Sequence, residues 1–286
     1  MSDENLRQRL GRYAAMQKSF YDWLGAEHPV AVVGHYDFHE NFPYETYLLF
    51  EYGDVRKPIF PDFSQRRAFD IGCGEGRMVR RMRSFFGQVD GADISQAMVE
   101  HARASTPGSS FWVTDGLSAG DAPSAAYDFA YCTISLQHIC VFTTRDLIVQ
   151  DVRRILKPDG KATFQMLFSR EYPFLPLGPP REHDGGVSQP FIRDRERVGW
   201  FEDRTDATST NSGCDALIGD VDLDAVRTYF QQYFARVEFW FADISVGRDW
   251  GDQRPAALPE THPNSHVSNL YWGTNYIFIH CDGVKS

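Results

Sequence analysis

The sequence is poor in the features that mark zinc proteins, small secreted proteins and membrane proteins. Its 286 residues include five cysteines, and no two of them form a CxxC pair. That spacing predicts neither a zinc site nor a disulfide framework, so we expect reduced thiols. No stretch approaches 18 consecutive apolar residues, and the polar start MSDENLRQRL does not resemble a signal peptide. We therefore expect a soluble, cytoplasmic protein that does not bind membranes.

Basic clusters are also scarce. The formal net charge is -10 and the sequence pI is near 5.3. A protein that binds nucleic acid needs a basic face to neutralise phosphates, and no run of Lys or Arg supplies one here. We therefore expect no nucleic-acid partner.

What the sequence does contain is an α/β alternation between residues 66 and 168. Short apolar runs alternate there with amphipathic stretches, which is typical of a parallel sheet with helices on its faces. The predicted strands are residues 67–71, 88–94, 109–115, 127–134 and 161–168. Helices are predicted over residues 75–86, 95–105 and 143–156.

The pattern stops after Phe168 and resumes with a helix over 221–234, a strand over 235–244 and a last strand over 275–283. The intervening residues 169–220 are rich in Pro, Gly and polar side chains, and we interpret them as an inserted loop that forms a substrate lid. Residues 1–65 precede the sheet and are predicted to form a helical cap. Within this cap, NFPYETYLLFEYG (41–53) has the punctuation of a helix, with Asn41 as N-cap and Gly53 beyond its end.

The stretch FDIGCGEG (69–76) follows the first predicted strand. Its three glycines run as GxGxG and Arg stands at position 77, so the dinucleotide fingerprint GxGxxG is absent, as is a Walker loop. An acid, Asp93, ends the second predicted strand, where a carboxylate can accept both hydroxyls of a ribose. A purely structural role, with a tight turn at the glycines and Asp93 capping the next helix, is the alternative.

Four motifs in this order resemble those of class I S-adenosylmethionine-dependent methyltransferases. They are FDIGCGEG, GADIS, VTDG, and YDFAYCTISLQHI with its later LKPDG turn. The resemblance covers roughly residues 66–168 and the final helix and strands. It implies a Rossmann-like, mostly parallel, seven-stranded sheet with helices on both faces and an antiparallel last strand. The domain would then span 66–286, with the cap and the lid added to it.

The resemblance implies S-adenosylmethionine as cofactor and S-adenosylhomocysteine as product. Glycine lets the backbone approach such a ligand closely, because a Cβ would collide. Asp93 would bind the ribose, Ile94 would pack on the adenine, Asp115 would face the adenine amino group, and Asp70 would lie near the ammonium group. The full set of expected cofactor contacts is Asp70, Gly72, Cys73, Gly74, Gly76, Asp93, Ile94, Asp115, Gly116, Thr133 and Gln137.

The acceptor is expected to be a small molecule. Family members that methylate nucleobases or glutamine carry a Pro-Pro-aromatic motif after the fourth strand, and this chain has CTISLQ there. The resemblance is therefore to the small-molecule O- and N-methyltransferases. Natural products, sugars and amino acids all stay open as acceptors.

Three residues are candidates for the catalytic machinery. His138 follows the fourth strand and is the first candidate for a general base, with a structural hydrogen bond on a helix face as the alternative. His35 is a candidate pocket residue, and Tyr44 would close over donor or acceptor, although a core position would also explain it. His35 and His39 have the i, i+4 spacing of a metal pair, but their segment does not read as helical, so no metal site is predicted.

Rival functions stay open for this sequence. The chain could be a non-catalytic S-adenosylmethionine-binding partner or regulatory protein, or a transferase of the same fold that uses the donor differently. A nicotinamide oxidoreductase is disfavoured by Arg77. The aromatic segment NFPYETYLLF (41–50) could form the face of a homodimer as readily as a pocket roof.

Overall fold

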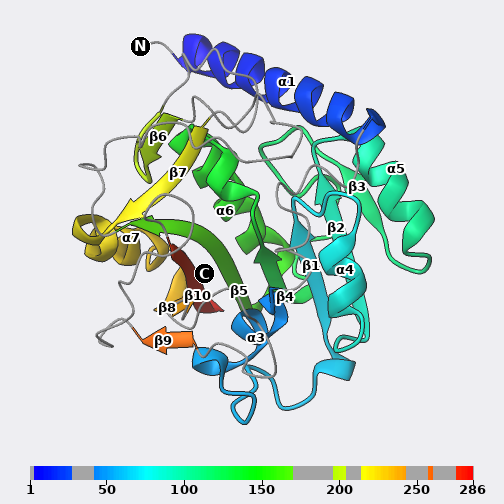
Figure 1. The fold of residues 1–286 in the computed structure, drawn as a ribbon, viewed down its shortest axis with the longest axis vertical. Helices are drawn as coiled ribbons and strands as arrows, with labels where there is room; N and C mark the ends of the chain where they lie inside the picture. Colours follow the sequence, from blue (N-terminus) through cyan, green and yellow to red (C-terminus); the bar gives the residue numbers. More distant parts are fainter. Residues whose placement is uncertain are drawn as a thin grey trace, which may run out of the picture.

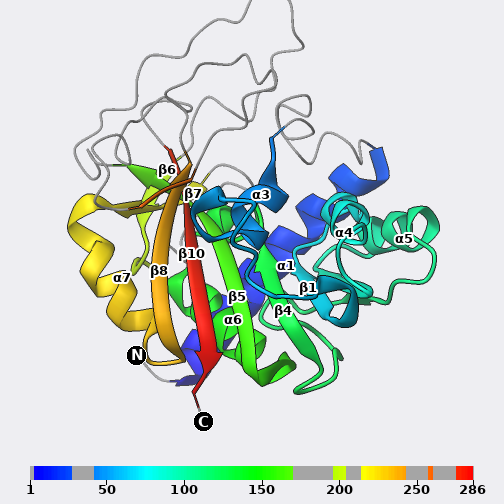
Figure 2. The same ribbon diagram turned by 90° about the horizontal axis from the view of Figure 1, so that it is seen from below.

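In the computed structural model, residues 3–27, 42–169, 196–203, 214–242, 257–259 and 275–285 are described. Ten strands of these residues form one sheet, in the order β3-β2-β1-β4-β5-β10-β8-β9, with β7 pairing with β5 and β6 with β7. Figure 1 shows the whole sheet, and Figure 2 shows β8, β10, β5, β4 and β1 side by side in that order.

The parallel half of the sheet contains the first five strands along the chain. They are β1 (Arg67–Ile71), β2 (Gln88–Asp93), β3 (Phe111–Val113), β4 (Tyr127–Cys132) and β5 (Leu156–Ser169). The other strands are β6 (Glu196–Gly199), β7 (Cys214–Gly219), β8 (Phe234–Ala242), β9 (Ala257–Pro259) and β10 (Asn275–Val284). Because β10 is antiparallel to both β5 and β8, the expected α/β class and antiparallel last strand are confirmed.

The helices connect and cover these strands. The α-helices are α1 (Asp3–Glu27), α3 (Tyr44–Leu49), α4 (Arg77–Met82), α5 (Gln96–Ser105), α6 (Phe142–Ile155) and α7 (Leu223–Phe230). Short 3-10 helices are η1 (Glu51–Gly53), η2 (Phe63–Gln65), η3 (Leu136–His138) and η4 (Asp220–Asp222). The helix predicted over 41–53 is therefore shorter than expected, and its N-cap is Pro43.

The segment expected to be an irregular loop contributes to the sheet. Residues Leu217–Gly219 of β7 pair in parallel with Leu167–Ser169 of β5. β10 pairs with one edge of β5 over residues 161–168. β4 pairs with the other edge only as far as Phe164, and β7 pairs with that same edge beyond it. The prediction of seven strands was too low by the three strands β6, β7 and β9, which lie in segments rich in polar residues, Pro and Gly.

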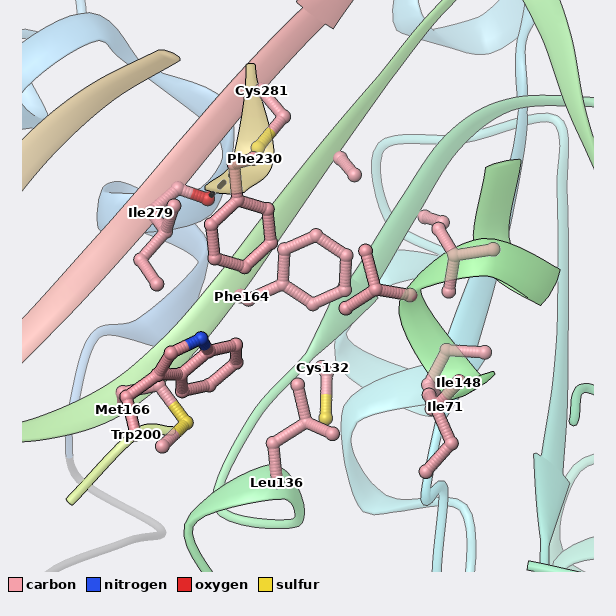
Figure 3. Close-up of a cluster of buried hydrophobic side chains, with 14 of the residues drawn as sticks. Ile71, Cys132, Leu136, Ile148, Phe164, Met166, Trp200, Phe230, Ile279 and Cys281 are labelled. Carbon is pink, nitrogen blue, oxygen red and sulfur yellow. Dashed lines mark hydrogen bonds between the residues drawn. The ribbon is translucent and has the colours of Figure 1, made fainter. Parts of the chain in front are cut away.

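Two hydrophobic clusters lie on opposite faces of the sheet. Buried side chains of α1, α6 and α7 pack on one face, and those of α3, α4 and α5 on the other. Figure 3 shows part of the first cluster, in which Trp200 lies near Met166 and Phe230. Trp200 is fully buried, and its ring centroid is 5.5 Å from that of Phe230. The segment after β6 is thus anchored in the main core, although it was expected to belong to a lid.

The cysteines differ partly from the expectation of reduced thiols. Cys73, Cys132 and Cys281 are free and buried, as expected. Cys140, in contrast, is disulfide-bonded. A separate observation concerns the helices: none in the described ranges is long and apolar enough to cross a membrane.

Candidate cofactor and acceptor site

A cavity of about 160 Å³ opens where the carboxyl ends of β1, β2 and β4 meet. The strand order reverses between β1 and β4, because β2 and β3 lie on one side of β1 while β4 and β5 follow on the other. Open α/β sheets bind ligands in the crevice at such a reversal. The lining residues come from these strand ends, from the glycine loop, from α1 and from the η3 region.

The glycine loop of residues 72–76 is held against β2. The backbone N–H groups of Gly72 and Cys73 both donate to the carbonyl of Ala92, at 2.8 and 3.0 Å. Gly72, Gly74 and Gly76 have φ values of 71°, 52° and 88°, in the left-handed region that disfavours other residues. The sequence motif therefore encodes a backbone turn that only glycine makes without strain.

Gly74 differs from the other two glycines in what surrounds it. A Cβ built on Gly74 would meet no atom within 4 Å, and the residue lines the cavity. A Cβ on Gly76 would already lie 3.3 Å from the side chain of Ala102, and Gly76 is not among the lining residues. The space in front of Gly74 is therefore available to a ligand that approaches the backbone.

Asp93 ties the end of β2 to the glycine loop. Its carboxylate accepts from the backbone N–H of Gly74 at 2.9 Å and from that of Ser95 at 2.9 Å. Burial raises the pKa of the Asp93 carboxyl, and the two backbone donors offset part of this rise. The side-chain cap of α5 is Ser95, and not Asp93 as the structural alternative had it; Asp93 instead links the glycine loop to the backbone of Ser95, and it lines the cavity as well.

Asp70 lies at the end of β1, with 2% of its surface exposed, and it also lines the cavity. Burial raises its pKa well above the usual range, and the nearby Arg77 offsets part of this rise. The Arg77 guanidinium in turn lies 5.5 Å from the centroid of the Tyr44 ring. Tyr44 is fully buried against Phe42, behind Arg77, and is not among the lining residues.

The end of the cavity beyond β2 is formed by Ile94 and by the loop after β3. A Cβ on Gly116 would lie 2.6 Å from Cδ1 of Ile94, so glycine at this position makes room for that side chain. Asp115 is exposed and is not among the lining residues; its Oδ1 accepts from the backbone N–H of Leu117 at 2.9 Å.

Helix α1 closes one side of the cavity with side chains that sequence analysis did not single out. Tyr13, Ala14, Gln17 and Tyr21 line it. The helix runs beside α5 (Figure 1), and the Ser95 hydroxyl donates to the Asp22 carboxylate at 2.8 Å. The sequence does contain a pattern that predicts this helix face, because residues 10, 13, 14, 17 and 21 recur at helical spacing.

His138 lies at the end of η3 and lines the cavity. Its Nδ1 is 3.0 Å from Oδ1 of Asp215 on β7, and both side chains are largely buried, with exposed fractions of 15% and 10%. Its Nε2 is 3.4 Å from Nε2 of Gln137. His138 was predicted as a site residue, whereas Asp215 was predicted only as part of the polar insert.

Arg145 of α6 fastens the segment after β6 to the η3 region. Its buried guanidinium donates to the carbonyls of Ile139, Gly199 and Trp200. It also lies 5.2 Å from the Trp200 ring centroid, a favourable cation–π distance. This clamp keeps the insert close to the segment that carries His138.

The structure therefore brings together most of the residues expected to bind the cofactor. Those that line the cavity are Asp70, Gly72, Cys73, Gly74, Asp93, Ile94, Gly116 and Thr133. Gly76, Asp115 and Gln137 are not among the lining residues, and the candidate His35 lies outside the described residues. In the described ranges, no group of three or more His, Cys, Asp or Glu side chains is arranged to hold a metal ion.

Comparisons with known proteins find similarity in the part of the chain that contains the glycine loop and the parallel strands. Residues 69–164 match the methyltransferase domain family. The chain is 28% identical to the ubiquinone biosynthesis O-methyltransferase of Proteus mirabilis, in an alignment that covers 51% of this chain and 62% of that protein. It is also 28% identical to the malonyl-[acyl-carrier protein] O-methyltransferase of Erwinia pyrifoliae, in an alignment that covers 35% of this chain and 37% of that protein. The chain thus matches less than two thirds of the length of either relative.

Solved structures that are similar to part of this chain include an S-adenosylmethionine-dependent methyltransferase from Mesorhizobium loti. The similarity covers 37% of this chain and 49% of that one, with 27% identity and a TM-score of 0.33. A longer similarity covers 78% of this chain and 76% of the [4+2]-cyclase SpnF, with 17% identity and a TM-score of 0.45.

Proposed function

We propose that the chain transfers a methyl group from S-adenosylmethionine to a small molecule, because residues 69–164 match the methyltransferase domain family. The acceptor atom is an oxygen or a nitrogen, on a natural product, a sugar or an amino acid-like compound. The proposal rests above all on the link between Asp93 and Gly74, which places a carboxylate and an open stretch of backbone side by side at the cavity.

The residues present fit the cofactor chemically. Asp93 has lone pairs left to accept ribose hydroxyls, because each carboxylate oxygen has two and accepts one N–H bond. Asp70 offers negative charge toward an ammonium group, and Gly74 leaves room for the ligand. Ile94 offers an apolar surface to a base. Asp115, being exposed, can reach the cofactor only from the rim of the cavity.

The reaction needs few chemical groups from the protein. S-adenosylmethionine, when bound, supplies an electrophilic methyl group and leaves as S-adenosylhomocysteine. The protein aligns the acceptor with this group and excludes water. His138 takes up the proton that the acceptor oxygen or nitrogen gives up, and Asp215 stabilises the resulting imidazolium.

The proposed organisation follows from these roles. Residues 1–65 act as a cap, of which α1 covers the cofactor cavity. Residues 66–286 form the methyltransferase domain, and the insert 169–220 supplies the acceptor side through Asp215. The net charge of -10 favours a small acceptor over a nucleic acid.

Calorimetric titration with S-adenosylmethionine and S-adenosylhomocysteine tests the cofactor site. We expect both to bind, and we expect Asp93→Ala to weaken binding by about 10-fold or more, since bonds to a charged group contribute about 1.5–3 kcal/mol. Asp121→Ala, which removes an exposed carboxylate away from the cavity, is the matched control and should bind like the wild type. Absence of binding by the wild type would refute the proposal.

A screen of alcohols, phenols, amines and amino sugars for S-adenosylhomocysteine release tests the transfer itself. Binding without release by any acceptor class would favour a non-catalytic binding protein.

A further inference from the structure

Ile134 has an unusual backbone conformation at the edge of the cavity. Its φ is 63°, and it is the β-branched member of the three non-glycine residues with positive φ in the described ranges. That conformation costs about 1–2 kcal/mol for such a residue, so the surroundings must hold it in place. The backbone N–H of Ile134 donates to Oε1 of Gln165, at 2.6 Å. Gln165 lies on β5 and is fully buried.

This one hydrogen bond determines the direction of a longer chain of bonds. A backbone N–H can only donate, so the group of Gln165 that faces Ile134 must be its oxygen. The Gln165 Nε2 then points to Gln137 and donates to its Oε1, at 2.9 Å. The Nε2 of Gln137 is consequently the group that faces Nε2 of His138, at 3.4 Å.

The tautomer of His138 follows from the same logic. An amide nitrogen can only donate, so Nε2 of His138 must present its lone pair to Gln137. The ring proton is then on Nδ1, which donates to Asp215 at 3.0 Å. Both ends of the imidazole therefore require the same tautomer, and a reversed Gln137 amide would oppose it.

We propose that Gln165 and Gln137 are positioning residues that fix His138 as the Nδ1–H tautomer, with Nε2 ready to accept a proton. This inference rests on the proposed function, in which His138 is the general base. The contact between Gln137 and His138 is long at 3.4 Å, so the O–H or N–H of an acceptor can replace it at little cost. The strained backbone of Ile134 is thereby connected to the proton-accepting atom.

The hydrogen bonds from Gln165 through Gln137 to His138 form a relay. Gln165→Met and Gln137→Glu change this relay at its two ends. Methionine at 165 keeps the volume but no longer donates to Gln137, whose amide is then able to reverse. Glutamate at 137 still accepts from Gln165, but it presents a carboxylate to Nε2 of His138 and so favours a proton there. Gln8→Glu, on an exposed face of α1, is the control for an added charge.

The readout is 15N NMR of the full chain labelled at histidine nitrogens, with the His138 signals identified by their loss in His138→Gln. In the wild type we expect the neutral imidazole to carry its proton on Nδ1 and to leave Nε2 unprotonated. Gln165→Met should show a second population with a protonated Nε2. Gln137→Glu should raise the midpoint of His138 protonation by about 1 pH unit or more, the usual effect of an added opposite charge.

Several other groups around His138 could influence this midpoint. Asp215 of β7 faces Nδ1, Arg145 of α6 binds the carbonyl of Ile139, and the Tyr13 hydroxyl of α1 accepts from the backbone N–H of Cys140. All are retained in every variant, as are Asp70 and Asp93 across the cavity. A change specific to the relay variants is therefore attributable to the relay.

The proposal is overturned if wild-type His138 carries its proton on Nε2, or if His138 has the same spectrum and protonation midpoint in Gln165→Met, Gln137→Glu and the wild type. Urea unfolding identifies variants that lose the fold, and Gln137→Glu keeps the test open if Gln165→Met does. Because the NMR readout needs neither cofactor nor acceptor, failure to bind S-adenosylmethionine would refute the proposed function and leave this result standing.

Discussion

The hydroxyl of Ser135 occupies the space in which a Cβ on residue 72 would stand. Its Oγ donates to the carbonyl of Gly72 at 3.1 Å, while a Cβ on Gly72 would lie 2.1 Å from that Oγ and 2.5 Å from the Cβ of Ser135. The glycine loop and the segment after β4 therefore interlock at this point, which joins the cofactor side of the cavity to the side that carries His138.

Gly72→Ala is expected to destabilise the fold by about 2 kcal/mol or more, from left-handed strain and from the clash with Ser135. The double variant Gly72→Ala, Ser135→Gly removes the clash and should recover part of the loss. Urea unfolding of both single variants and the double variant measures this coupling. Strictly additive effects would show that the two residues do not interlock.

Gly74→Ala should separate backbone strain from ligand exclusion. Its Cβ has free space in the protein, so we expect only the strain of about 1–2 kcal/mol. Binding of S-adenosylmethionine should fall by about 10-fold or more, because the Cβ enters the space proposed for the ligand. Gly108→Ala is the matched control, with φ of 90° and its nearest contact at 3.5 Å, away from the cavity. Equal affinities in both variants would place the ligand elsewhere.

Asp70→Asn is expected to stabilise the protein without cofactor at alkaline pH. The pKa of Asp70 is about 3.8 in the unfolded chain, and burial raises it in the folded protein. At a pH between the unfolded-state pKa and the folded-state pKa, the folded protein therefore binds more protons than the unfolded chain. The free energy of unfolding therefore falls as pH rises through this window. An asparagine has no charge to bury, so we expect the variant to be more stable than the wild type at about pH 8.

Thermal unfolding of both proteins between about pH 4 and pH 8 measures this difference, which should shrink toward the acidic end. A variant less stable than the wild type at the alkaline end would mean that the attraction between Asp70 and Arg77 outweighs the cost of burial. Titration of the same variant should show weaker cofactor binding.

His138→Gln should lower kcat by about 10²–10⁴-fold once an acceptor is found, the usual contribution of a general base. Asp215→Asn should lower kcat less, because it leaves the base in place but removes the charge that stabilises the imidazolium. Affinity for S-adenosylhomocysteine should be unchanged in both, since neither residue belongs to the proposed cofactor contacts. His101→Gln, exposed on α5, is the control. Full activity of His138→Gln would assign the histidine a structural role.

The parallel half of the sheet could be predicted from sequence because its central strands are largely buried and rich in apolar residues. In β4 all six residues are buried, and five of them are apolar or aromatic. The glycine loop could be predicted as well, since three glycines in five positions directly after a strand indicate a tight backbone turn. Helix α5 begins where predicted, with Ser95 as a side-chain cap.

The acceptor side could not be predicted in the same way. β6 and β7 have four and six residues and lie within a polar segment that lacks the alternation of apolar runs and amphipathic helices. Asp215 is 77 residues from His138, and the sequence of the insert contains nothing that distinguishes this acid from its neighbours. The chain of bonds from Ile134 through Gln165 and Gln137 depends on side-chain direction, which hydrophobic periodicity does not report.

The placement of β7 on the edge of β5 beyond β4 also has a consequence for synthesis of the chain. Every strand and loop proposed to hold the cofactor precedes residue 170, whereas Asp215 is translated 77 residues after His138. A nascent chain thus contains the proposed cofactor contacts before His138, the proposed base, has acquired its partner Asp215. With these roles, full activity requires β7 in the sheet, so the order of translation separates the ability to bind the cofactor from the ability to use it fully.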